Sequence, residues 1–136
     1  MERKIVKDTL FLNQVSTLAD KSDRQVIVDL KDTLAAHREN CAGMAANMIG
    51  YHKRIIIVNA FISDLVMVNP EIVQSSGRYT TKEGCLSLSG ERQTNRFEKI
   101  KVKYLDENFK PITQEFSGFI AQVIQHEVDH CNGIII

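Results

Sequence analysis

The segment His126-Glu127-Val128-Asp129-His130 contains the residue types of a metal-dependent hydrolase. Histidines at positions i and i+4 of a helix lie one turn apart on the same face, so both rings can reach one metal ion. Glu127, beside them, can take a proton from a water molecule activated by that metal. The alternative is a solvated polar turn with two surface histidines. Apolar residues between Phe119 and Ile124 predict that the helix is buried, which favours the metal site.

A catalytic metal site of this type needs a third protein ligand. Only six residues follow His130 in this sequence, and the one candidate among them, Cys131, points away from the face that carries the rings. We therefore expect the third ligand upstream. Cys85 is the best candidate, because a thiolate binds divalent metals strongly and Gly84 permits the backbone bend that would aim it. Cys41 is the runner-up, and a buried inert cysteine is the alternative interpretation of Cys85.

The remaining pattern predicts helices at both ends of the chain with strands between them. We expect a helix from Ser22 to Glu39, opened by a capping box of Ser22 and Gln25, with Val26, Leu30 and Leu34 on its apolar face. Strands are expected at 54–59, 65–68 (ending at Pro70), 99–104 and 112–116, and a second helix at 117–132 between Ser117 and Gly133. This order predicts a single α+β domain over residues 1–136.

The composition excludes several classes of partner. Basic and acidic residues are equal in number, so the formal net charge is zero and nothing attracts nucleic acid or an anionic membrane. The longest apolar runs, such as 55–58, are too short to cross a bilayer. No signal-peptide apolar region follows the first residues, and three cysteines cannot all pair with one another. We therefore expect reduced thiols and a cytoplasmic location.

Three segments together resemble the motifs of peptide deformylases. Glu83-Gly-Cys-Leu-Ser87 is similar to the second motif of that family, and Gln125-His-Glu-Val-Asp-His130 to the third. Gly43-Met-Ala-Ala46 is similar to the core of the first motif. Enzymes of this family remove the formyl group from the N-terminal methionine of new bacterial and organellar proteins. The resemblance implies antiparallel β-sheets packed around a central C-terminal helix that carries the two histidines, with one N-terminal helix.

The resemblance also implies roles for the residues of the metal site. Cys85, His126 and His130 would bind one divalent metal, with Fe²⁺ favoured and Zn²⁺, Ni²⁺ or Co²⁺ able to substitute. Glu127 would accept a proton from the attacking water and pass it to the leaving amine. The backbone N–H of Leu86 would help to hold the oxyanion that develops on the formyl group.

Five residues are expected to contact the formyl-methionyl peptide by the same resemblance: Gly43, Met44, Met48, Arg96 and Val123. Gly43 would hydrogen-bond to the peptide backbone, and the methionine side chain would lie against Val123. Arg96 would lie along the peptide, although a solvated charge is an equally good interpretation. The glycine also has a second interpretation, as a small residue that permits close packing. Glu83 is expected to orient the cysteine turn rather than to react.

The chain departs from the family pattern at Met48, where the family has a glutamine that donates to the developing oxyanion. A thioether has no hydrogen to donate, and loss of one such donor costs roughly a hundred- to a thousandfold in turnover. Two alternatives therefore stay open: a diverged hydrolase of another small amide, or a binder of formyl-methionine. Many bacterial members continue past the metal helix into a helix that contacts the ribosome. This sequence stops before such a helix, so ribosome contact is left undecided.

Overall fold

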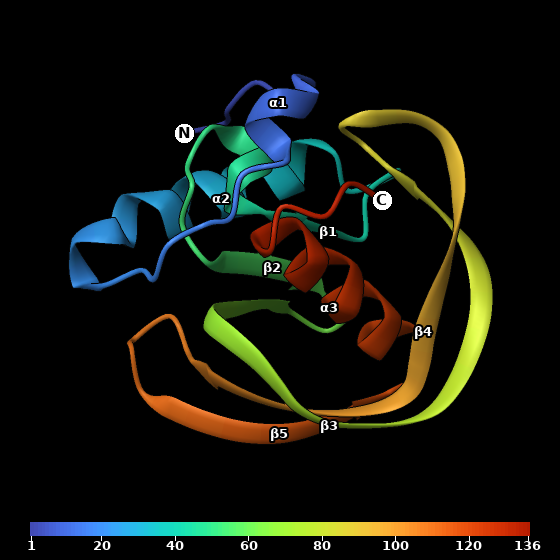
Figure 1. The fold of residues 1–136 in the computed structure, drawn as a ribbon. Coiled ribbons are helices and arrows are strands. Elements are labelled where there is room, and N and C mark those ends of the chain that lie inside the picture. The colour runs from blue at the N-terminus through green and yellow to red at the C-terminus, as the bar shows by residue number, and fades with distance from the viewer.

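Five antiparallel strands in the order β1-β2-β3-β4-β5 form one sheet that curves around helix α3 (Figure 1). In this computed structural model of residues 1–136, the strands are β1 (Gly43–Ala45), β2 (Ile55–Asn59), β3 (Asp64–Cys85), β4 (Leu88–Leu105) and β5 (Pro111–Ser117). The helices are α1 (Thr9–Leu12), α2 (Arg24–Ala36) and α3 (Gly118–Cys131), with short 3₁₀ turns η1 (Lys21–Asp23) and η2 (Ala46–Ile49). The α+β class and the antiparallel sheet around the C-terminal helix are confirmed.

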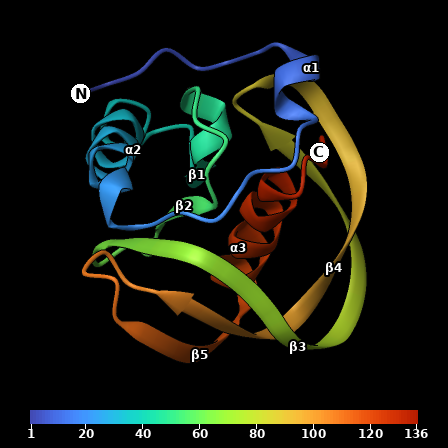
Figure 2. The same cartoon turned by 60° about the vertical axis from the view of Figure 1, so that its left-hand side comes forward.

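Strand β2 is buried on both faces and separates two hydrophobic cores. Ile55 and Ile57 point into the core that contains α2, and Ile56 and Val58 point into the core that contains α3. All four side chains are fully buried, as the apolar, β-branched run predicted. Figure 2 shows α2 and α3 on either side of this strand. The strand thus forms the shared wall between the core that contains α2 and the core that contains α3.

Strands β3 and β4 are far longer than the sequence predicted. The expected strands at 65–68 and 99–104 are only their central-sheet ends, and the rest forms a two-stranded arm that bends around α3 (Figure 1). Pro70 does not end β3. It lies at a register shift between Val68 and Glu71, where a bulge accommodates the missing N–H and bends the strand. The distal part of the arm is mostly exposed and polar, so it has no apolar alternation to mark it as a strand.

The predicted capping residue of the N-terminal helix is wrong. Asp20, not Ser22, caps η1: its carboxylate accepts from the Ser22 N–H at 2.8 Å, while the Asp23 carboxylate accepts from the Asp20 N–H at 2.9 Å. Helix α2 then begins at Arg24. Its predicted apolar face (Val26, Leu30 and Leu34) is buried. The short helix α1 was not predicted, so the N-terminal part holds two helices and not one.

Helix α3 occupies the predicted position and lies inside the curve of the sheet (Figures 1 and 2). Ser117 precedes it, but the side chain makes no capping hydrogen bond, contrary to expectation. Gly133 follows it at φ 72°, the left-handed conformation that ends a helix without strain in glycine. The Gln125 side chain clamps α3 to β4, bonding to both the N–H and the carbonyl of Phe97 at 2.8 Å. None of the helices is long and apolar enough to span a bilayer.

The fully buried carboxylate of Asp29 ties α2 to the N-terminal segment, and it predicts acid sensitivity. Burial alone would raise the pKa of Asp29, but hydrogen bonds from the Met1 ammonium, Gln25 and Arg3 outweigh it and lower this pKa to about 2. A lowered pKa stabilises the fold above the unfolded value of about 3.9, and this stability is lost as pH falls toward 2. The contribution at neutral pH is about 1–2 kcal/mol, because the partners are partly exposed.

Asp29→Asn should therefore lower the free energy of unfolding at pH 7 by about 1–2 kcal/mol, and the gap to wild type should narrow as the pH falls below 4. Urea denaturation at several pH values measures both proteins. Asp32→Asn is the matched control, because that carboxylate also accepts from Met1 but its side chain is 50% exposed. A gap that is the same at pH 7 and pH 3 would contradict the role of the Asp29 charge.

Candidate metal centre

Cys85 and the two histidines of α3 converge at one point inside the curve of the sheet. Cys85 is the last residue of β3, and its Sγ lies 3.4 Å from Nε2 of His130. The Nε2 atoms of His126 and His130 are 3.1 Å apart, and all three ligand atoms lie within 4.8 Å of one another. The sequence-predicted trio is thus brought together by elements about 40 residues apart in the chain. Cys41 and Cys131 are not part of the cluster.

The donor atoms fit a divalent cation. Ligand atoms bound at about 2.0–2.3 Å to one ion are about 3–4 Å from one another. Two of the three separations here, 3.4 and 3.1 Å, lie in that range, and all three atoms lie within 4.8 Å of one another. His130 is fully buried and His126 nearly so, and their Nε2 atoms face each other. Burial lowers the pKa of His130 to about 3, so this ring is neutral and one of its nitrogens carries a free lone pair. One thiol and two imidazoles are the ligands that zinc-like and ferrous ions accept.

A buried carboxylate orients His126. Glu83 accepts from His126 Nδ1 at 2.8 Å, from Gln122 at 2.8 Å and from two nitrogens of Arg96 at 2.7 and 2.9 Å. Burial would raise the pKa of Glu83, but these hydrogen bonds outweigh it and lower the pKa to about 2. The carboxylate therefore stays ionised and fixes the ring with Nε2 toward the cluster. Its geometry is that of a group that orients His126, whereas the expected role in orienting the cysteine turn stays a prediction.

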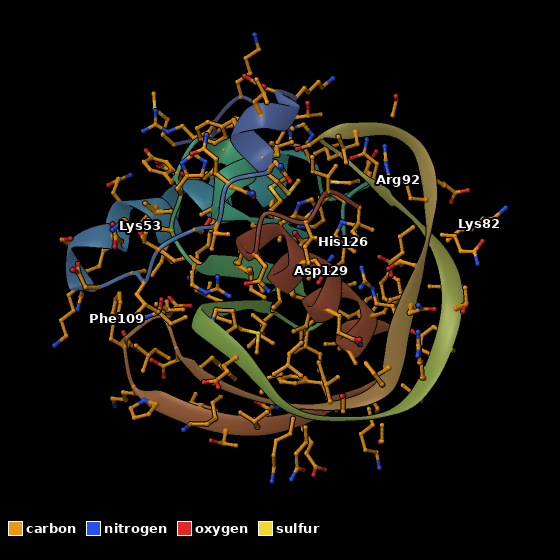
Figure 3. The ribbon with its side chains drawn as sticks, in the orientation of Figure 1. Lys53, Lys82, Arg92, Phe109, His126 and Asp129 are labelled. Atoms are coloured by element: carbon orange, nitrogen blue, oxygen red, sulfur yellow. The ribbon has the colours of Figure 1, made fainter.

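The structure corrects the expected place of Arg96. Its side chain is 4% exposed and is shared between Glu83 and Asp129, the latter at 2.7 Å, so it has no free group to lay along a peptide. It does not line the cavity beside the cluster. Figure 3 shows Asp129 on α3 inside the curve of the sheet, while Lys82 on β3 points outward. The sequence offered no signal for this pairing, because Arg96 and its partners lie on three different elements.

A cavity of about 250 Å³ opens beside the cluster. Cys85, His126 and Glu127 lie at one side of it, and the remaining walls include Cys41, Gly43, Met48, Leu86, Phe119 and Val123. Leu86 and three of the five expected substrate contacts therefore lie at the cavity. The fourth, Met44, does not: its side chain is fully buried in the core that contains α2, so no side-chain contact with a substrate is possible there. The cavity thus has apolar side chains on one wall and the ionisable groups of the cluster on another, which suits a site that hydrolyses an amide.

Glu127 is the carboxylate on the cluster side of the cavity. It is 3% exposed, its Oε1 makes no hydrogen bond within the protein, and burial raises its pKa to about 7. Gly43 lies directly against it: a Cβ on Gly43 would stand 3.3 Å from Oε2 of Glu127, 2.7 Å from Val123 and 2.9 Å from the carbonyl of Ile57. Glycine is thus required for β1 to pack against α3, and both Gly43 and Glu127 line the cavity.

Comparison with known proteins decides the family. The model of the polypeptide deformylase family matches residues 5–136. The chain is 53% identical to the peptide deformylase of Clostridium beijerinckii over the full length of both chains. It is similar to a peptide deformylase structure from Legionella pneumophila, with 35% identity, a TM-score of 0.90, and coverage of 99% of this chain and 83% of that one. The chain belongs to the peptide deformylase family.

A second solved relative is the class I type b peptide deformylase of Acinetobacter baumannii with Met-Ala-Ser bound, at 31% identity and a TM-score of 0.89, covering 99% of this chain and 97% of that one. Peptide deformylases are metal-dependent hydrolases that remove the formyl group from the N-terminal formyl-methionine of nascent peptides, and this chain is such an enzyme. The family uses a divalent metal, and the cysteine and two histidines form a group that could hold it. No finding favours the diverged-hydrolase or binding-protein alternatives.

The departures from the peptide deformylase pattern meet in the cavity. Met48 is 1% exposed, and its Sδ accepts weakly from the Ala45 N–H at 3.5 Å. The Cys41 thiol donates to the Gly43 carbonyl at 3.0 Å. Burial and the nearby Glu127 charge raise the pKa of Cys41 to about 12, so it stays a protonated thiol. Both sulfur side chains are therefore held by backbone contacts at the wall of the cavity.

Glu83→Gln should weaken metal binding roughly ten- to a hundredfold, because it removes the charge that orients His126 and that Arg96 needs. The Zn²⁺ dissociation constant, measured by competition with a chromophoric chelator, tests this. Glu91→Gln is the matched control, since Glu91 lies on the same arm but is exposed. Equal Zn²⁺ affinity in Glu83→Gln and wild type would show that the carboxylate does not act on the metal site.

Proposed function

We propose that Cys85, His126 and His130 hold the catalytic metal, and that it is Fe²⁺, with Zn²⁺, Ni²⁺ or Co²⁺ able to replace it. The convergence of the three ligand atoms within 4.8 Å beside an open cavity carries this proposal. A divalent metal in this place supplies the Lewis acidity that lets water attack an amide at neutral pH. Three protein ligands beside a cavity are typical of a catalytic site rather than a closed structural one.

Glu127 is the proton carrier in this proposal. Its Oε1 has no partner within the protein and the side chain borders the cavity, so the carboxylate is available to a water molecule there. It takes one proton from the water as the water oxygen bonds to the formyl carbon. It then gives that proton to the methionine nitrogen as the C–N bond breaks, which releases a free amine and formic acid, and the acid ionises to formate in water. The carboxylate returns to its starting state.

The cavity walls bind the formyl-methionyl end. Val123, one turn before His126 on α3, and Phe119 offer an apolar surface for the methionine side chain. Gly43 lies beside Glu127 and lines the cavity, and in this proposal its backbone hydrogen-bonds to the peptide. The Leu86 N–H, next to Cys85, is the donor placed to hold the oxyanion. Because nascent peptides are the substrate, we place the activity in the cytoplasm, where they are made.

Formate release from a formyl-methionyl peptide tests the proposed roles. Protein purified without oxygen and loaded with Fe²⁺ should release formate, and Glu127→Gln should lower turnover by at least a hundredfold without loss of bound metal. The control is the Glu91→Gln variant, whose side chain is exposed and does not line the cavity. Turnover that survives in Glu127→Gln would remove this residue from the mechanism, whereas loss of metal would make it a ligand.

Met48→Gln should raise turnover at least tenfold, because an amide N–H replaces a thioether that cannot donate to the oxyanion. The kcat for the same peptide measures the effect, and KM should change less than kcat. Met44→Leu is the matched control, since Met44 is equally buried but does not border the cavity. An unchanged kcat in a folded, metal-loaded Met48→Gln protein would show that the oxyanion is held by other donors.

A further inference from the structure

The two histidine Nδ1 atoms, which face away from the metal cluster, differ in their hydrogen bonding. Nδ1 of His126 bonds to Glu83 at 2.8 Å. Nδ1 of His130 is buried and makes no hydrogen bond to any protein group. For Nε2 of His130 to offer its lone pair to a metal, Nδ1 must carry the hydrogen, and a buried N–H without an acceptor is costly. An acceptor for His130 is therefore required.

Asn47 in η2 presents an unused acceptor beside the same residue. Its side chain is 1% exposed, and its Nδ2 donates to the backbone carbonyl of His130 at 3.0 Å and to that of Leu12 at 3.4 Å. These two bonds fix which end of the amide is nitrogen. The other end, Oδ1, is buried and has no hydrogen-bond partner in the protein. Asn47 thus holds an idle carbonyl oxygen next to the last turn of α3.

A third buried group meets the same turn. The N–H of Ser16 donates to the carbonyl of Cys131, the residue after His130, at 2.9 Å. The Ser16 hydroxyl is also buried without a partner. Leu12, which accepts from Asn47, lies only four residues before Ser16. Two of the unpartnered polar atoms therefore belong to residues that bond to the last turn of the metal helix, and the third, Nδ1 of His130, belongs to that turn itself.

We propose that Asn47 is a positioning residue for His130, acting through one buried water that Ser16 also holds. The water accepts from Nδ1 of His130 and donates to Oδ1 of Asn47, and the Ser16 hydroxyl completes its shell. A buried water typically makes about three hydrogen bonds, which is the number available here. The proposal rests on the proposed role of His130 as a metal ligand, and it extends that role to the residue that orients the ring.

This arrangement gives the two histidines different partners. Glu83 is a charged acceptor that is tied to Arg96, whereas Asn47 is a neutral acceptor that is tied to Leu12. The orientation of His130 then depends on how the N-terminal segment packs against α3. Loss of a partner of this kind typically weakens metal binding ten- to a hundredfold.

The test compares Zn²⁺ dissociation constants of three variants with wild type, by chelator competition, alongside the His130 Nδ1–H signal in ¹⁵N NMR of the Zn²⁺-loaded proteins. Asn47→Ala should raise the dissociation constant roughly tenfold or more and speed exchange of that proton with solvent. Ser16→Ala should have a smaller effect in the same direction. Ser87→Ala is the matched control, because Ser87 has a buried, unpartnered hydroxyl but lies on the Cys85 side of the site.

Asn47→Asp separates positioning from packing. It keeps the acceptor and loses both Nδ2 bonds, so urea denaturation should show a less stable fold while the Zn²⁺ dissociation constant stays within about threefold of wild type or becomes tighter. Equal weakening of Zn²⁺ binding by Asp and Ala would mean a purely structural residue and overturn the proposal.

Wild-type protein gives a test that needs no variant. In the Zn²⁺-loaded form, the His130 Nδ1–H should be present and show a nuclear Overhauser effect to a long-lived water. An Nδ1–H with no such water, or an effect of Ser87→Ala in place of Asn47→Ala, would overturn the proposal. Failure of wild type to bind Zn²⁺ at all would instead refute the metal role of His130, so the two failures are distinguishable.

Discussion

The site depends on one constraint: the end of the β3–β4 arm must be held against the last turns of α3, because Cys85 lies on the arm and both histidines lie on the helix. The ion-paired network of Glu83, Arg96 and Asp129 spans β3, β4 and α3 and provides this attachment. Charges buried in this way are costly unless every partner is satisfied, and here each carboxylate has a bonded guanidinium. The Gln125 clamp on β4 adds neutral hydrogen bonds one turn away.

The same attachment serves the chemistry. Glu83 belongs both to the network that holds the arm and to the hydrogen bond that orients His126. The hydrogen bonds from Arg96 keep the Glu83 carboxylate from rotating away from His126. The packing of the arm against α3 therefore sets the orientation of the imidazole ring. On the opposite side of the cluster, small residues let β1 approach α3 closely, and this approach places Glu127 at the cavity. Fold and reactive geometry are therefore set by the same contacts.

The parts of the site that depend on the spacing of residues close together in the sequence could be predicted. The histidine spacing, the buried strand before the arm and the apolar start of α3 all depend on residues a few positions apart. Cys85 was proposed as the third ligand from the affinity of a thiolate for divalent metals and from the backbone bend that Gly84 permits. The long arm could not be predicted, because its exposed strands are polar on both faces. Arg96 was misplaced because it and its two carboxylate partners lie on three different elements, and no local pattern encodes such a pairing. Met44 was misplaced for a related reason, since alternate residues of β1 face different cores.

The cavity also shows how this chain differs within its family. Two sulfur side chains, Cys41 and Met48, lie in the cavity wall, and Met48 stands where the resemblance leads us to expect a glutamine. Neither joins the metal cluster, and neither offers a strong hydrogen-bond donor to an oxyanion. In the mechanism proposed above, backbone N–H groups and the metal therefore provide the charge stabilisation.

The metal site itself is the central claim, and zinc K-edge X-ray absorption of the Zn²⁺-loaded protein tests it most directly. We expect one sulfur at about 2.3 Å and two imidazole nitrogens at about 2.0–2.1 Å, with the sulfur lost in Cys85→Ser and retained in Cys41→Ser. Two sulfur scatterers in wild type, or one that disappears with Cys41→Ser, would contradict the assignment of Cys85, His126 and His130 as the ligand set.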